Sequence, residues 1–185
     1  MDNQDQIDQI LAALNRQTGL LQEILAHLQQ SRLGFRDVAG RTRIYCNRQH
    51  GSCWYRLDAD NNPVPIPHAG LTGYVTKLEF SKVQRRGKET IKLQVSVRAD
   101  CLYVLEAGYD SYFSKGLLSA IASLTPEQIR KPITIRPQPG EDEAVLFCRV
   151  EQDSTLIRAP YDDLTDWRGV AAKAIALVNR AWASQ

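Results

Sequence analysis

The chain has 185 residues, of which 43% are hydrophobic and 24% charged, with a formal net charge of +2. This length and composition fit one ordinary globular domain with a short appendage, and they exclude disordered and collagen-like classes. No stretch is apolar enough for a membrane span, and the amino terminus is acidic and polar, unlike a secretory signal. We therefore expect a cytoplasmic protein that does not contact membranes.

Charge is distributed unevenly along the chain. Residues 71–100 contain seven Lys and Arg against three acidic residues, whereas residues 141–166 contain eight acidic residues against two Arg. We expect a molecule with one positive and one negative side, and the positive side favours a polyanionic partner.

Residues 1–33 have the pattern of an amphipathic helix. The two core positions of a heptad are apolar apart from one glutamine, and they are occupied by Ile7, Ile10, Leu14, Gln17, Leu21, Ile24 and Leu28. This pattern predicts a coiled coil through which copies of the chain self-associate, over residues 7–28. The alternative is a helix whose apolar stripe packs on its own domain.

Residues 34–68 are predicted to form a linker and a β-hairpin. The runs RTRIYC and CWYRLD are rich in β-forming residues and flank the polar segment NRQHGS, which is typical of two paired strands. The segment PVPIP that follows predicts an extended, stiff connection.

Residues 69–185 begin with the most regular pattern in the chain. We expect a strand over 71–81 in which one face is shared by Tyr74, Thr76, Leu78 and Phe80. After the turn QRRGKE, apolar and polar residues alternate strictly from Ile91 to Arg98. This alternation predicts a second strand with one buried and one wet face.

The remaining elements follow in order. We expect a third strand over 101–107, a helix over 113–124, two strands over 131–137 and 144–151, and a final amphipathic helix over 165–182. Thr125, Pro126 and Gln128 have the spacing of a capping box with proline at the first helical position, so a short helical turn is predicted there.

The order strand, strand, strand, helix, strand, strand is that of a five-stranded Greek-key barrel. In topology and strand pattern, residues 71–160 resemble an OB-fold of the single-stranded-DNA-binding type. The predicted fold class is mainly β with α. It consists of an amino-terminal coiled-coil helix, then an OB-like barrel that occupies residues 69–185 together with the carboxy-terminal helix.

The resemblance implies that single-stranded DNA or RNA lies across the outer face of strands two and three. Phosphates need cations, for which the candidates are Lys77, Lys82, Arg85, Arg86, Lys88, Lys92 and Arg98. Bases need flat aromatic faces, for which the candidates are Trp54, Tyr55, Tyr103, Tyr109 and Tyr112. The acidic loop QPGEDE opposes this interpretation. The alternative is a solvated hairpin tip above core aromatic residues.

Metal binding and catalysis are expected to be absent. Cys46, His50 and Cys53 could supply three zinc ligands, with His68 as a fourth, but no Cys-x-x-Cys pair occurs in the chain. No nucleophile elbow or glycine-rich phosphate loop is present either. We therefore expect no cofactor and no enzymatic activity.

Two functions of different classes follow from these features. The first is an oligomeric protein that binds single-stranded DNA or RNA without sequence specificity, through a basic face and aromatic stacking. The second is a protein-interaction or assembly subunit that uses the OB-like scaffold and the coiled coil to dock a protein partner.

Overall fold

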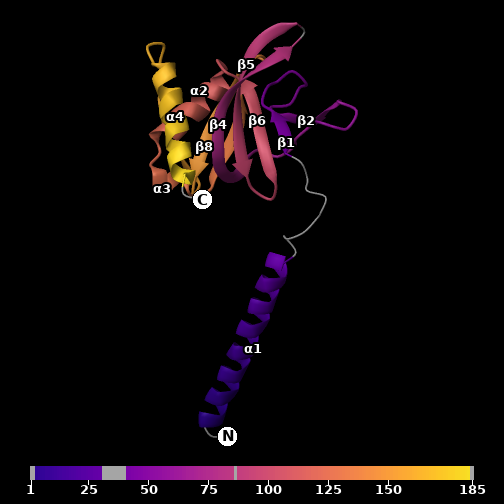
Figure 1. The fold of residues 1–185 in the computed structure, drawn as a ribbon, viewed down its shortest axis with the longest axis vertical. Coiled ribbons are helices and arrows are strands. Elements are labelled where there is room, and N and C mark those ends of the chain that lie inside the picture. Colours follow the sequence, from indigo (N-terminus) through magenta and orange to yellow (C-terminus); the bar gives the residue numbers. More distant parts are fainter. Residues whose placement is uncertain (1–2, 31–40, 86, 184–185) are drawn as a thin grey trace. The chain divides into compact units, whose positions relative to one another are not determined.

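The computed structural model describes residues 3–30, 41–85 and 87–183 (Figure 1). The chain divides into two compact units, Met1–Val38 and Ala39–Gln185. The first contains one helix, and the second contains a large sheet with its covering helices.

Helix α1 (Asn3–Gln30) confirms the predicted amino-terminal helix. The members of its apolar stripe for which burial is described, Ile10, Leu11, Leu14, Leu21 and Ile24, are all more than half exposed. Pairing of this stripe with another copy stays a prediction. Among the described helices, none combines the length and the apolar character that a membrane crossing requires.

The second unit is built on nine strands joined in one sheet, in the order β3-β2-β1-β6-β5-β4-β7-β8-β9. In chain order these strands are β1 (Thr42–Tyr45), β2 (Tyr55–Leu57), β3 (Pro63–Pro65), β4 (Leu71–Arg85), β5 (Lys88–Arg98), β6 (Leu102–Gly108), β7 (Ile133–Pro139), β8 (Leu146–Gln152) and β9 (Thr155–Leu156). All neighbours are antiparallel except β1 and β6, which are parallel.

The fold is therefore mixed α/β with an open sheet. The five strands predicted from residues 71–151 are adjacent, as β6-β5-β4-β7-β8. Closure of these strands into a barrel is not confirmed, because the second neighbour of β6 is β1 and not β8. The predicted hairpin is present as β1 and β2, whereas the linker predicted before it, from residue 34 to residue 40, lies outside the described residues. The segment predicted as a stiff connection pairs with β2 as the edge strand β3.

Three helices pack in the second unit: α2 (Tyr112–Ser123), α3 (Pro126–Ile129) and α4 (Trp167–Trp182). The predicted capping box is confirmed, since Thr125 and Gln128 each bond the other's backbone N–H at the start of α3. Gly116 lets α2 approach β8 closely, because a Cβ there would lie 2.8 Å from the carbonyl oxygen of Cys148.

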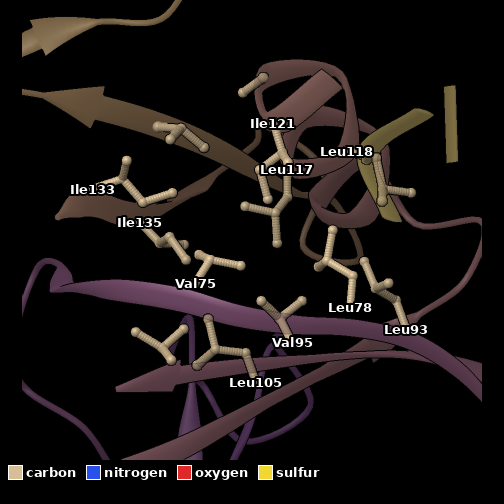
Figure 2. Close-up of a cluster of buried hydrophobic side chains, with 14 of the residues drawn as sticks. Val75, Leu78, Leu93, Val95, Leu105, Leu117, Leu118, Ile121, Ile133 and Ile135 are labelled. Atoms are coloured by element: carbon tan, nitrogen blue, oxygen red, sulfur yellow. The ribbon is translucent and has the colours of Figure 1, made fainter. Parts of the chain in front are cut away.

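The core lies between the sheet and α2 (Figure 2). Figure 2 shows the two sides of this core. Val75 and Leu78 of β4, Leu93 and Val95 of β5 and Leu105 of β6 face Leu117, Leu118 and Ile121 of α2 and Ile133 and Ile135 of β7. All of them are at most 3% exposed. The alternation predicted for β5 is confirmed at Leu93, Val95 and Val97, which are buried between polar neighbours.

A β-bulge between Val75 and Lys77 changes the predicted faces of β4. Val75 and Leu78 pair with core residues of β5, whereas Tyr74 pairs with Arg98 on the opposite face. The prediction that Tyr74 shares a face with Leu78 is therefore wrong, because the bulge adds one residue to the strand between them and reverses the alternation.

Helix α4 packs on its own sheet through Ala174, Val178 and Ala181, all buried in the core. At its end, Trp182 Nε1 donates a hydrogen bond of 2.8 Å to the carbonyl oxygen of Val75, beside the bulge. This contact ties the carboxy-terminal helix to the strand that begins the hairpin.

Candidate nucleic-acid interface

The candidate interface begins with the outer part of the β4–β5 hairpin. β5 pairs with β6 as far as Lys92, opposite Gly108, whereas β4 and β5 stay paired out to Arg85 and Lys88. Residues 82–91 therefore form a two-stranded arm, whose turn includes Gly87 with a φ of +75°. The arm has one acidic residue, Glu89, and four cationic ones, Lys82, Arg85, Arg86 and Lys88.

Two of the predicted phosphate ligands make ion pairs with neighbouring carboxylates. Lys82 Nζ lies 2.9 Å from Glu89 Oε1 in the arm, and Lys77 Nζ lies 2.6 Å from Glu79 Oε2 on the outer face of β4. All four side chains are exposed. Since exposed pairs of this kind contribute about 0–1 kcal/mol, a phosphate can replace either carboxylate at little cost.

The arm is also cationic at its tip and at its root. Arg85 and Lys88 form the last cross-strand pair of the ladder, while their side chains and all of Arg86 lie outside the described part of the chain. Lys92 at the root borders a polar pocket of about 210 Å³, together with Tyr45 and Glu106. The backbones of Lys82, Arg85, Lys88 and Lys92 thus lie along a ribbon roughly 13 Å long, at about 3.3 Å per residue.

Arg98 lies apart from this group. It is ten residues along β5 from Lys88, which corresponds to roughly 33 Å of strand. Its guanidinium carbon lies 5.5 Å from the ring centroid of Tyr74 and 5.2 Å from that of Trp182. Arg98 therefore holds α4 against the sheet through cation–π contacts, and it is not brought together with the cations of the arm.

The outer face of β5 and β6 contains a buried carboxylate. Glu106 is 5% exposed, and its Oε2 lies 3.2 Å from Arg43 Nη1 and accepts a hydrogen bond of 3.1 Å from Gln94 Nε2. These contacts join β1, β6 and β5. A phosphate laid directly over Glu106 would meet a negative charge, so this face is a poorer phosphate site than the arm.

Two predicted stacking residues lie on the core side of the sheet. Tyr103 pairs with the buried Val97 and so shares its face, and its hydroxyl donates to Asp100 Oδ2 at 3.2 Å. Trp54 is buried, and its Nε1 donates to the carbonyl oxygen of His68 at 3.0 Å. Neither residue presents a ring to the outer face, because strand alternation directs both of them inward.

Tyr55 and Tyr112, which were also predicted to stack on bases, lie on different surfaces. The ring of Tyr55 is buried on the outer face, stacked on Tyr45 at 5.2 Å and met edge-on by His50 at 4.7 Å. Tyr112 is 49% exposed at the start of α2, where its ring packs 5.3 Å from that of Phe147. The predicted stacking residues therefore do not form one continuous platform.

The cysteines and histidines considered for zinc are not brought together. Among the described residues there is no group of three or more metal-ligating side chains. Burial raises the pKa of the Cys46 thiol far above its usual range, with Glu106 adding to the effect. His50 instead packs its ring edge against Tyr55. A neutral, buried thiol is a poor nucleophile.

The structure also contains a groove that the pattern of the sequence does not indicate. It has a volume of about 510 Å³ and lies beside the root of the arm, lined by Phe80, Ile91, Tyr109, Asp110, Lys115, Leu118, Trp167, Arg168, Ala171, Ala172 and Ile175. Alternation assigns Phe80 and Ile91 to the core side, and both lie on it, yet they are 40% and 38% exposed. Of the residues considered for stacking, Tyr109 lies in this groove.

Comparison of the chain with protein-family models, with curated proteins and with solved structures finds no match in any of the three. The function proposed below therefore depends on the geometry of the chain alone.

Proposed function

We propose that this chain binds single-stranded DNA or RNA without sequence specificity, and that the arm is its principal phosphate-binding element. The observation that supports the proposal is the ladder itself, which continues past the edge of the sheet as a two-stranded ribbon rich in Lys and Arg. Two-stranded ribbons have little stability of their own. A long, highly charged ribbon is therefore better explained by binding of a ligand than by a contribution to the stability of the fold.

Electrostatics gives the arm its mode of binding. When Lys and Arg side chains bind nucleic-acid phosphates, they displace the condensed counterions. The logarithm of the binding constant therefore falls linearly with the logarithm of the salt concentration. The exposed Lys82–Glu89 pair can exchange its carboxylate for a phosphate with little loss. Backbone contacts of this kind read no bases, which agrees with sequence-nonspecific binding.

An OB-like arrangement of the central strands is part of this proposal. Their order, β6-β5-β4-β7-β8 with a helix between the third and fourth strands along the chain, supports it. In such an arrangement the β4–β5 hairpin corresponds to the loop between strands one and two, which borders the nucleic-acid site in OB-folds.

Self-association through residues 7–28 is the second part of the proposal. The apolar stripe of α1 is exposed in the described residues, and its heptad spacing suits a parallel coiled coil. Joining several arms in one particle raises their effective concentration, so modest sites act together. We expect Leu14→Asp with Leu21→Asp to reduce the mass measured by light scattering to that of one chain. An unchanged mass would show that the stripe has another role.

The rival function is that of a protein-docking subunit. It is favoured by Leu164, which is 92% exposed in an acidic loop. Hydrogen bonds between Asp162 and Thr165, and from the Leu164 backbone N–H to Asp162 Oδ1, hold this loop. An exposed leucine among aspartates suits a partner protein whose pocket is apolar with a basic rim. This function does not require nucleic acid, so one titration separates the two.

The experiment is a titration of fluorescein-labelled oligo-dT with the full chain at about 50 and 200 mM salt. Changing Arg85, Arg86 and Lys88 together to Glu should weaken binding at least about 100-fold. It should also reduce the logarithmic salt slope by about 2, which corresponds to roughly three phosphate contacts at 0.7 each.

The matched control reverses three exposed cations outside the arm, through Lys131→Glu, Arg158→Glu and Lys173→Glu. This variant has the same net charge as the arm variant, so it measures the general effect of charge. Equal losses in the two variants, or no binding of the unmodified chain at low salt, would contradict the proposal.

A further inference from the structure

The groove beside the root of the arm has three walls. Phe80 and Ile91 contribute the core side of the β4–β5 hairpin, Tyr109 lies in the connection from β6 to α2, and Trp167 begins the wall formed by α4. Leu118 of α2 lies among the lining residues. The groove therefore lies on the core side of β4 and β5, the same two strands that continue outward as the arm.

Aromatic rings line this groove and are partly accessible. Tyr109 is 54% exposed and Phe80 40% exposed, and Trp167 is half-buried with its ring 5.0 Å from that of Tyr161. Single-stranded nucleic acids bind by stacking unpaired bases on such rings, whatever the base, because every base has a π-face. The groove thus supplies the stacking surface that the outer face of β5 and β6 does not provide.

Cations surround these rings. Lys115 Nζ lies 5.4 Å from the Trp167 ring centroid and 2.7 Å from Asp110 Oδ1, whose hydrogen bond raises the pKa of the lysine. Arg168 lies on the α4 wall. Lys82 pairs across the ladder with Ile91, so it lies on the groove side of the arm. Lys115 and Lys82 are paired with the carboxylates of Asp110 and Glu89, and Arg168 adds a third cation, so three positive groups stand against two negative ones. The small positive excess beside the rings suits a polyanion.

The dimensions favour a base over a protein helix. A volume of about 510 Å³ falls within the roughly 300–1,000 Å³ of small-ligand sites. A docked helix about 10 Å across needs a longer apolar channel with anchors along several turns. Direct continuity with the arm also allows one strand to contact both surfaces, its phosphates on the arm and its bases in the groove.

We infer that the groove lined by Phe80, Tyr109 and Trp167 accepts unstacked bases of a single-stranded nucleic acid whose phosphates lie on the arm. This inference depends on the proposed function and adds to it the site at which bases are held. Charge and stacking are thereby separated: the arm determines the salt dependence, and the groove determines an affinity term that salt does not change.

The test compares Phe80→Ala and Tyr109→Ala in the full chain, by titration of labelled oligo-dT across a range of salt concentrations. Each variant should bind about 5- to 100-fold more weakly, as expected for one lost base stack, with an unchanged logarithmic salt slope. Phe147→Ala is the matched control, since Phe147 is 39% exposed but does not line the groove. It should bind like the unmodified chain.

A second readout uses tryptophan fluorescence. Oligo-dT should quench the emission of the full chain, and Trp167→Phe should remove most of that quench. An oligonucleotide made of abasic sites should bind through the arm without the quench. These measurements still test the inference if Phe80→Ala fails to fold, which a thermal unfolding curve would reveal.

The possible failures can be told apart. If the groove variants bind as tightly as the unmodified chain while the arm variant does not bind, the groove inference is overturned and the proposed function stands. If the unmodified chain does not bind oligo-dT at low salt, both are wrong. If the groove variants alter only the particle mass, the groove is a protein contact, which also overturns the inference.

Discussion

In the inner part of the β4–β5 hairpin, Leu78, Leu93 and Val95 are at most 3% exposed, whereas Phe80 and Ile91, farther along the same ladder, are 40% and 38% exposed. The two sets lie on the same side of the same strands and are equally apolar. They differ in what covers them. The inner set faces side chains of α2 and β7 in the core (Figure 2), whereas Phe80 and Ile91 line the open groove.

Alternation of apolar and polar residues therefore predicts the face on which a side chain lies, but not whether other elements bury that face. Apolar residues on an uncovered face leave part of their transfer free energy unrealised, at about 25 cal/mol per Å² of accessible apolar surface. Such a surface beside clustered cations is suited to a ligand that is both flat and charged. If the hairpin has a covered inner part and an uncovered outer part, substitutions in the two parts should differ in their effect on stability.

The largest effect is expected from Leu93→Ala in the inner part. Leu93 is buried among core side chains, so the lost transfer energy and the cavity together should reduce the free energy of unfolding by about 2–5 kcal/mol. Ile91→Ala, two residues away in the exposed part, should cost only about 1 kcal/mol. Urea denaturation measures both. Similar losses of unfolding free energy for Leu93→Ala and Ile91→Ala would contradict the distinction between a covered inner part and an uncovered outer part.

A smaller effect is expected where α4 meets the inner part. Trp182→Phe keeps a ring but removes the 2.8 Å hydrogen bond to the Val75 carbonyl, which should reduce the free energy of unfolding by about 1–2 kcal/mol. Trp167→Phe, in the half-buried groove wall, is the control and should cost about 0.5 kcal/mol or less. The same denaturation experiment decides. A larger loss of unfolding free energy for Trp167→Phe than for Trp182→Phe would contradict the assignment of the stabilising contact to the carboxy-terminal end of α4.

The smallest effect is expected at the tip of the arm. Gly87 has a φ of +75°, so Gly87→Ala should cost about 1 kcal/mol. Because the arm is two-stranded, most of that cost should appear as local opening, with amide exchange in residues 82–91 faster by about 5-fold. Gly87→Asn is the control, since asparagine tolerates a positive φ better than alanine. A large fall in the thermal midpoint for Gly87→Ala would mean that the arm unfolds together with the core.

Local patterns predicted most of the elements correctly. The heptad of residues 1–33, the alternation from Leu93 to Val97 and the capping box at Thr125 each depend on residues within one or two turns or strands of one another. The short strand β9, the edge strand β3 and the bulge in β4 were not predicted. A bulge is a property of two strands in register, so it cannot be identified in one strand read alone.

The candidate site was predicted in part. The concentration of cations in residues 82–88 was evident from composition, and the ladder extends them as an arm. The positions of Trp54 and Tyr103 were not, because β1 joins β6 in parallel and the core side of this extended sheet takes in both rings. The buried Glu106 likewise depends on Arg43 and Gln94, which come from the strands on either side.

The amino-acid sequence by itself determined the amphipathic helix, the alternating hairpin and the basic character of its turn, because these depend on side-chain periods and on charges close together in the chain. Tertiary structure alone decided which apolar residues are covered, where the sheet ends and where a groove opens. Those features arise from pairing and packing between segments far apart in sequence, and a one-residue bulge or a new neighbouring strand changes them without changing any local pattern.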